Sequence, residues 1–114
     1  MKTNTLIAIA IALLSLGLSA TADDQIVSLA YEVNLNNFHA PATSNGSASF
    51  KECADCTTHL VRVTPATRYA INGRAVQLGE FKQACMLAND RDEIAVTVLR
   101  HLESDTIQSI DVFL

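Results

Sequence analysis

A two-residue turn constrains this chain more than any other feature of its sequence. Asn72-Gly73 lies between two runs typical of strands, "TRYAI" and "RAV". Both central residues of a type I′ turn need a positive φ, and Asn-Gly is the preferred pair for it. The sequence therefore predicts a β-hairpin in which Tyr69 faces Val76 and Ile71 faces Arg74.

Alternation of apolar and polar residues predicts further strands on both sides of this hairpin. In "QIVSLAYEVNL" one face holds Val27, Leu29, Tyr31, Val33 and Leu35. Segments 47–53 and 58–64 are shorter strand candidates, and 36–47 reads as a loop because of its Pro, Gly, Asn and Ser content. The last two strands flank a turn at residues 103–105, and their apolar faces hold Ile94, Val96 and Val98 in one and Ile110, Val112 and Leu114 in the other.

The segment "QLGEFKQACMLAND" changes to a helical period. Its apolar residues recur at spacings of three and four, on one stripe made of Leu78, Phe81, Cys85 and Ala88. The order of elements predicts an α+β fold: a small, mainly antiparallel β-sheet or partly closed barrel of about six strands with one short helix. The sequence does not choose between the open sheet and the barrel.

The N-terminal segment has the order of parts of a secretory signal peptide. Lys2 is followed by an apolar run over residues 6–18, and Ala20-Thr21-Ala22 suits a cut before Asp23. The apolar run is shorter than the ~20 residues of a membrane-spanning helix. We therefore expect residues 1–22 to be a signal peptide, residues 23–114 to form a single β-rich domain, and the mature protein to be periplasmic or secreted in a bacterium, without membrane insertion.

The mature chain is acidic. Removing residues 1–22 removes Lys2 and no acidic residue, so the 8 basic residues become 7 against 12 acidic ones, a formal charge of −5. A dispersed acidic charge argues against nucleic acid as a partner, which needs a clustered basic surface. With no Trp and 2 Tyr, the chain also has few aromatic platforms for stacking sugars or bases.

Three cysteines, Cys53, Cys56 and Cys85, leave one without an internal partner. Loop entropy alone would favour a bridge to Cys85, by roughly 3.7 kcal/mol against roughly 2 kcal/mol for the short loop. However, Cys53 and Cys56 are neighbours across a predicted turn, and Cys85 lies on the apolar helical stripe, where a thiol behaves as a small hydrophobe. We expect a Cys53–Cys56 disulfide and a free Cys85 thiol; a Cys85 bridge and three free thiols are the alternatives.

The C-x-x-C motif also occurs in redox and metal sites. A redox pair sits at a helix N-terminus, whereas this pair runs into a strand and is flanked by Glu52 and Asp55, whose charges raise a thiol pKa. A Cys₃His zinc set would need His59 and Cys85 as well, and the second half lacks the paired spacing of such sites.

The remaining sequence contains no catalytic pattern that we recognise. His39, His59 and His101 are not spaced as metal ligands, and "DRDE" at 90–93 lacks the order of a calcium loop. Nucleophile elbow, phosphate loop and paired catalytic carboxylates are missing. Four arginines lie on predicted strands, where they could bind an anion if they gathered on one face: Arg62, Arg68, Arg74 and Arg100. We predict no catalytic residue, metal ligand or cofactor.

The order of motifs over residues 48–114 resembles a group of small exported bacterial proteins of unknown function with a C-x-x-C turn followed by a β-rich domain. The matching positions are Cys53, Cys56, Val61, Thr67, Tyr69, Gly73, Val76, Leu78 and Phe81. Thr57 departs from the pattern, in which proline often follows the second cysteine. The resemblance implies a fold and an exported location, and no activity.

These observations favour an exported cell-envelope protein without enzymatic activity. We expect a binding or accessory module, stapled by its C-x-x-C disulfide, that contacts an envelope or extracellular protein through a sheet edge or its acidic surface. The alternative is a thiol-disulfide redox or metal-handling protein that uses Cys53 and Cys56.

Overall fold

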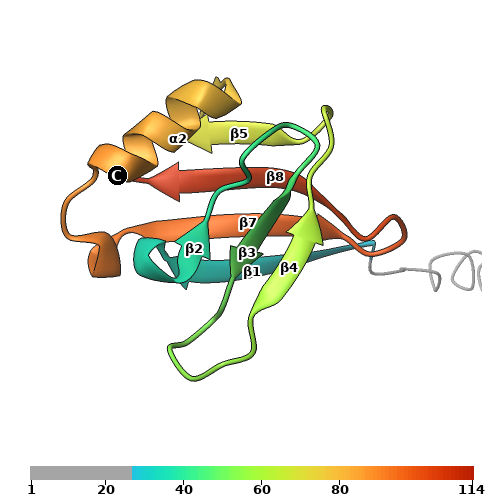
Figure 1. The fold of residues 1–114 in the computed structure, drawn as a ribbon, viewed down its shortest axis with the longest axis horizontal. Helices are drawn as coiled ribbons and strands as arrows, with labels where there is room; N and C mark the ends of the chain where they lie inside the picture. The colour runs from blue at the N-terminus through green and yellow to red at the C-terminus, as the bar shows by residue number, and fades with distance from the viewer. Residues whose placement is uncertain (1–26) are drawn as a thin grey trace, which may run out of the picture.

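The structure, a computed structural model, describes residues 27–114 and combines strands with one α-helix in that range (Figure 1). The strands are β1 (Ser28–Asn34), β2 (Phe38–His39), β3 (Ser47–Phe50), β4 (His59–Arg62), β5 (Arg68–Ile71), β6 (Arg74–Val76), β7 (Ala95–His101) and β8 (Thr106–Phe113). The helix is α2 (Leu78–Leu87), and two 3₁₀ helices are η3 (Leu35–Asn37) and η4 (Arg91–Glu93). The predicted signal peptide lies outside the described residues. None of the described helices has the length and apolar content needed to cross a membrane.

The predicted fold class is confirmed: the strands form one mainly antiparallel sheet that does not close. Eight strands take part, in the order β1-β7-β8-β4-β3-β2, with β5 also on β8 and β6 on β5. The sequence predicts about six strands. The two-residue β2 lies in the segment expected to be a loop, and it forms by pairing Phe38 with Phe50 of β3. Two pairings are parallel, β4 with β8 and β5 with β8. The short connections between the predicted strands suggested antiparallel pairing only.

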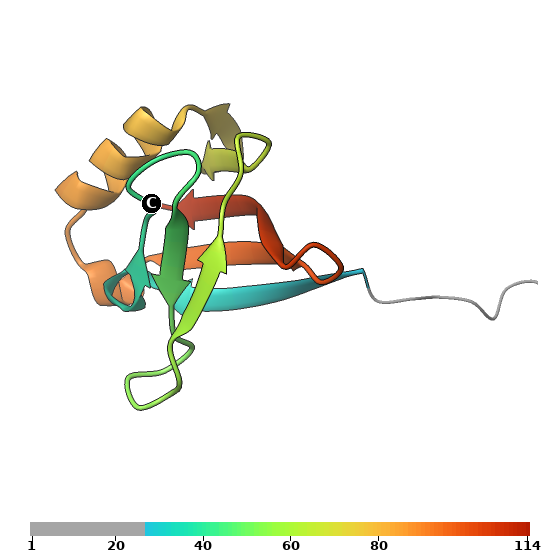
Figure 2. The ribbon, with the colours of Figure 1, turned by 45° about the vertical axis from the view of Figure 1, so that its right-hand side comes forward.

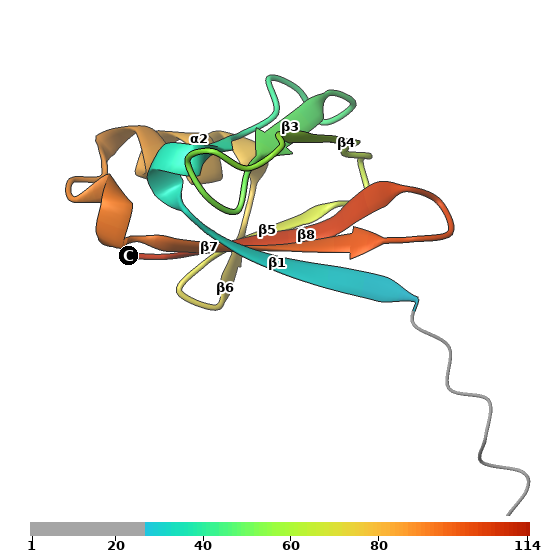
Figure 3. The same ribbon diagram turned by 90° about the horizontal axis from the view of Figure 1, so that it is seen from below.

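The sheet divides at β8 into two parts. On the same side of β8, β4 pairs at Thr106 and β5 pairs at residues 109–112. The chain bends between these two strands, at Thr64–Thr67. As a result β4, β3 and β2 turn over one face of the sheet while β5 and β6 continue it. Figure 3 shows β3, β4 and α2 together on one side of the layer made by β1, β7, β8 and β5.

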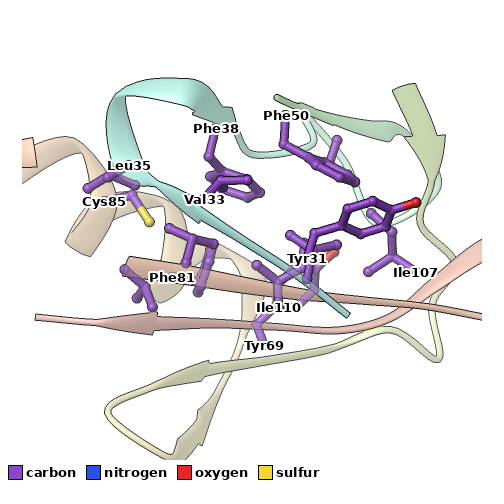
Figure 4. Close-up of a cluster of buried hydrophobic side chains, with 14 of the residues drawn as sticks. Tyr31, Val33, Leu35, Phe38, Phe50, Tyr69, Phe81, Cys85, Ile107 and Ile110 are labelled. Carbon is purple, nitrogen blue, oxygen red and sulfur yellow. The ribbon is translucent and has the colours of Figure 1, made fainter. Parts of the chain in front are cut away.

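The hydrophobic core lies between these layers (Figure 4). In the layer made by β1, β7 and β8, cross-strand pairing aligns the buried side chains in two rows. One row is Tyr31, Val98 and Ile110, and the other is Val33, Val96 and Val112. The opposite wall comes from Ala48, Phe50, Val61, Phe81 and Cys85. The predicted apolar faces extend beyond this core at their ends: Val27, Leu29 and Leu114 are 57%, 43% and 53% exposed.

The Asn-Gly hairpin has the predicted geometry and a further role. Asn72 and Gly73 have φ values of 52° and 84°, and Tyr69 pairs with Val76 as Ile71 does with Arg74. The backbone N–H of Asn72 donates to the Val112 carbonyl at 2.9 Å, and its side-chain oxygen accepts from the N–H of Leu114 at 2.8 Å. The turn therefore also holds the end of β8.

The predicted helical stripe is confirmed, since Phe81 and Cys85 are the buried residues of α2. Beyond the helix, residues 90–93 include η4, and the side chain of Arg91 extends back to the helix. Its guanidinium donates to the carbonyl of Cys85 and, at 3.5 Å, to that of Leu35. Arg91 thus satisfies a carbonyl in the last turn of the helix and joins it to η3.

Thr67 fixes the bend between β4 and β5. This residue is 8% exposed, and its hydroxyl accepts from the N–H of Thr64 at 3.0 Å and donates to the carbonyl of Ile107 at 2.6 Å. The hydroxyl therefore takes the place of a ladder bond at Ile107, on the side of β8 where β4 pairs at Thr106 and β5 pairs only from Ser109 onward.

Thr67→Val should destabilise the protein by about 2–3 kcal/mol, because it leaves a buried carbonyl and a backbone N–H without partners. Thr67→Ser keeps the hydroxyl and loses one methyl group, so it should cost about 1 kcal/mol. Denaturant unfolding of both variants measures the difference. Equal losses in the two variants would show that packing, not the hydroxyl, holds the bend.

Candidate functional site

The C-x-x-C motif forms the tip of the hairpin between β3 and β4. The predicted disulfide is present: the sulfur atoms of Cys53 and Cys56 are 1.97 Å apart. The N–H of Cys56 donates to the carbonyl of Cys53 at 3.1 Å, which closes a tight turn. Both cysteines are exposed, and the tip projects away from the two layers (Figure 2). The bridge is therefore accessible to other molecules.

The surroundings of the disulfide do not favour a stabilised thiolate. No helix begins at residues 51–58, so neither sulfur gains the positive end of a helix dipole. Asp55 is exposed between the two cysteines, and Glu52 lies before them. His59 is occupied at the base of the tip, where it approaches Glu52 at 3.3 Å and stacks on Phe50 with ring centroids 5.3 Å apart.

Cys85 lies far from the tip. His59 at the base of the tip contacts Tyr31, with ring centroids 4.9 Å apart, and Figure 4 shows Cys85 near Leu35, at the opposite end of the core from Tyr31. Cys85 is buried and takes no part in the disulfide. Burial raises the pKa of its thiol, and the charge of Arg91 opposes this in part. The Cys₃His set considered from the sequence is thus not brought together, and residues 27–114 contain no cluster of His, Cys, Asp and Glu suited to a metal ion.

The edge strand β1 is the second candidate surface. Among the described residues it pairs with β7 alone, in an unbroken antiparallel register over all seven residues. The other strands with one neighbour, β2 and β6, have two and three residues. Natural proteins block edges with Pro, Lys, bulges or very short strands. β1 has none of these devices, and Glu32 is its one charged residue.

The third candidate is a cavity of about 420 Å³ where the sheet divides. It lies on the side of the sheet away from the core, and its lining includes Thr64, Arg68, Leu99, His101, Ser104, Thr106, Gln108 and Ser109. In the sequence, Arg68 and His101 are considered separately, as possible ligands of an anion and of a metal. The sequence does not predict the cavity, because the cavity depends on the parallel pairing of β5 with β8.

The four strand arginines do not gather on one face. Arg74 binds Glu80 at 3.0 Å. Arg100 binds Asp105 and, at 3.2 Å, the hydroxyl of Tyr31, and these hydrogen bonds raise its pKa further. Arg62 lies on β4, whereas Arg68 lies on β5 beside the cavity.

Thiol alkylation should separate the three cysteines. The folded protein should react slowly with iodoacetamide, since Cys85 is buried and its raised pKa reduces the thiolate fraction. One thiol should react after unfolding without reductant, and three after unfolding with reductant. Intact mass counts the added groups, and peptide mapping should place the single early group on Cys85. Two or three groups without reductant would contradict the disulfide.

Comparisons of the chain with protein-family models, curated proteins and solved structures found no match. The structure itself shows a C-x-x-C disulfide in a β-rich α+β fold. A function for this chain therefore has to be argued from the hairpin tip, the β1 edge and the cavity.

Proposed function

We propose that this chain is an exported cell-envelope protein whose mature domain, residues 23–114, is a non-catalytic binding or accessory module. It contacts a partner protein through the free edge of β1. The Cys53–Cys56 disulfide serves as a staple of the β3–β4 hairpin and takes no part in catalysis. The module needs no cofactor for this function.

The unblocked edge of β1 carries the proposal. A strand with one neighbour presents a row of N–H and C=O groups that can accept an extended segment of another protein. The regular register of β1 keeps this row straight over seven residues. Val27 and Leu29, at its N-terminal end, are 57% and 43% exposed and would give an added strand an apolar contact.

Three observations support export. Residues 1–22 have the order of a signal peptide. The exposed Cys53–Cys56 bridge would persist in an oxidising compartment such as the periplasm and would be reduced in the cytosol. The resemblance to small exported bacterial proteins agrees with both. The formal charge of −5 on the mature chain, from 7 basic and 12 acidic residues, suits a protein partner better than nucleic acid or an anionic membrane.

The alternative function, thiol-disulfide exchange or metal handling through Cys53 and Cys56, rests on one observation. Both cysteines are exposed at a projecting tip, where a second thiol could attack the bridge. Equilibration with glutathione buffers tests it, because a staple stays oxidised at the glutathione poise whereas a redox pair titrates there.

Site-specific photo-crosslinking tests the edge proposal. A photoreactive phenylalanine analogue at Leu29 of β1 should yield a discrete adduct with an envelope protein in cells that make the chain. The same analogue at Met86 is the matched control. Met86 is 73% exposed but lies on the helix α2, which presents no strand edge.

An adduct from Met86 and none from Leu29 would contradict the β1 proposal, as would adducts of equal yield at both sites. Adding Ala30→Lys to the Leu29 reporter places a charge on the edge and should reduce its adduct severalfold.

Processing tests the export proposal. Intact mass of protein recovered from the periplasm or the medium should correspond to residues 23–114. Replacing both Ala20 and Ala22 by Leu should leave a longer, membrane-associated precursor, because signal peptidase requires small residues before the cut. Full-length protein in the cytosol would contradict export.

A further inference from the structure

The cavity at the division of the sheet has a lining that differs from the rest of this acidic protein. Its polar side chains come from five segments: the bend at Thr64, β5 at Arg68, β7 at His101, the following turn at Ser104, and β8 at Thr106, Gln108 and Ser109. Its volume, about 420 Å³, lies in the range of small-ligand pockets, roughly 300–1,000 Å³.

A register shift in β8 concentrates these groups. Leu99 pairs with Ser109 and Arg100 with Ile107, so Gln108 is an additional residue without a partner on β7. Because of this bulge, Ile107 and Ile110 are both buried although they are three residues apart, and Gln108 and Ser109 both line the cavity. Bulges often re-aim side chains at functional sites.

Arg68 provides the charge of the cavity. It pairs in parallel with Ser109, which places the two residues side by side at the cavity wall. The ion pairs within residues 27–114 involve His59, Arg74 and Arg100, so the guanidinium of Arg68 keeps its donors for another molecule.

On the opposite wall, hydrogen bonds orient His101. The N–H of Ser104 donates to its Nδ1 at 3.3 Å, and the hydroxyl of Ser104 lies 3.1 Å from the same atom. Nδ1 is therefore an acceptor, and the ring proton of the neutral histidine sits on Nε2, which remains free to donate. The Ser104 hydroxyl also lies 2.7 Å from that of Thr106, which links both to the same network.

We propose that this cavity binds a tetrahedral oxyanion, such as free phosphate or the phosphoryl group of a small ester. Arg68 supplies charge-assisted hydrogen bonds, and His101, Ser109 and Thr64 supply neutral donors from other directions. Donors on several walls match the four oxygens of phosphate better than the planar carboxylate. Asp111, two residues beyond Ser109 on β8, is not part of the lining. The proposal is independent of the β1 edge.

Titration of the ¹⁵N-labelled protein with sodium phosphate, at an ionic strength held constant with sodium chloride, tests the site. Amide signals of Thr64, of residues 66–68 and of residues 101–109 should shift and saturate. Arg68→Gln should weaken the affinity at least about tenfold, since a charge-assisted hydrogen bond is lost. Arg74→Gln, which changes an exposed arginine on β6 whose partners Ile71 and Glu80 lie outside the cavity, should leave the affinity unchanged.

Further arms identify the ligand class. Tighter binding of glycerol 3-phosphate than of phosphate assigns the site to a phosphate ester, and equal binding assigns it to the free anion. Acetate should bind at least tenfold more weakly than phosphate. Three results would overturn the proposal: shifts that do not saturate, equal affinity of acetate, or wild-type affinity in a folded Arg68→Gln protein.

Discussion

The hydroxyl of Thr67 holds the corner on which both layers of this fold depend. It accepts from the N–H of Thr64 and donates to the carbonyl of Ile107, so it joins the bend to β8 where neither β4 nor β5 can. With the corner fixed, β8 pairs with β4 at Thr106, before Ile107, and with β5 at residues 109–112, after Ile107. The first pairing brings β3 and β2 over the core, and the second extends the sheet and forms the cavity wall that carries Arg68.

This corner also explains why the sheet stays open. Beyond this corner, β1 and β2 are the two ends of the strand order. In a closed barrel, backbone hydrogen bonds would join these two strands; here, side-chain contacts connect the two layers. Tyr31 of β1 meets Phe50 of β3 with ring centroids 5.0 Å apart, and His59 of β4 packs against both. Aromatic contact thus closes the core while the backbone edge of β1 stays unpaired. The closed core and the unpaired edge of β1 therefore both result from the corner at Thr67.

The features that the sequence predicts correctly are those that depend on residues close to one another in the chain. Asn72-Gly73 specifies its turn, the stripe of Phe81 and Cys85 specifies a helix, and Cys53 and Cys56 bridge within one turn. The rest depends on contacts between distant segments, which periodicity does not encode. β2 exists because Phe38 meets Phe50, and Ile107 and Ile110 are both buried because a bulge interrupts the alternation of β8. For the same reason the sequence could suggest an edge or an arginine site, but could not identify β1 or place Arg68 beside Ser109.

The two kinds of cysteine in this protein have separate environments, and this separation would make an odd thiol tolerable in the oxidising compartment that we propose. An exposed thiol would exchange with the Cys53–Cys56 bridge by attack of its thiolate on a sulfur. Cys85 is prevented from this twice, because burial raises its pKa and because it sits at the far end of the core from the hairpin. Arg91 donates to the Cys85 carbonyl at the end of α2, and its charge opposes the rise in the thiol pKa only in part. Packing therefore protects the staple that the exposed hairpin cannot protect by itself.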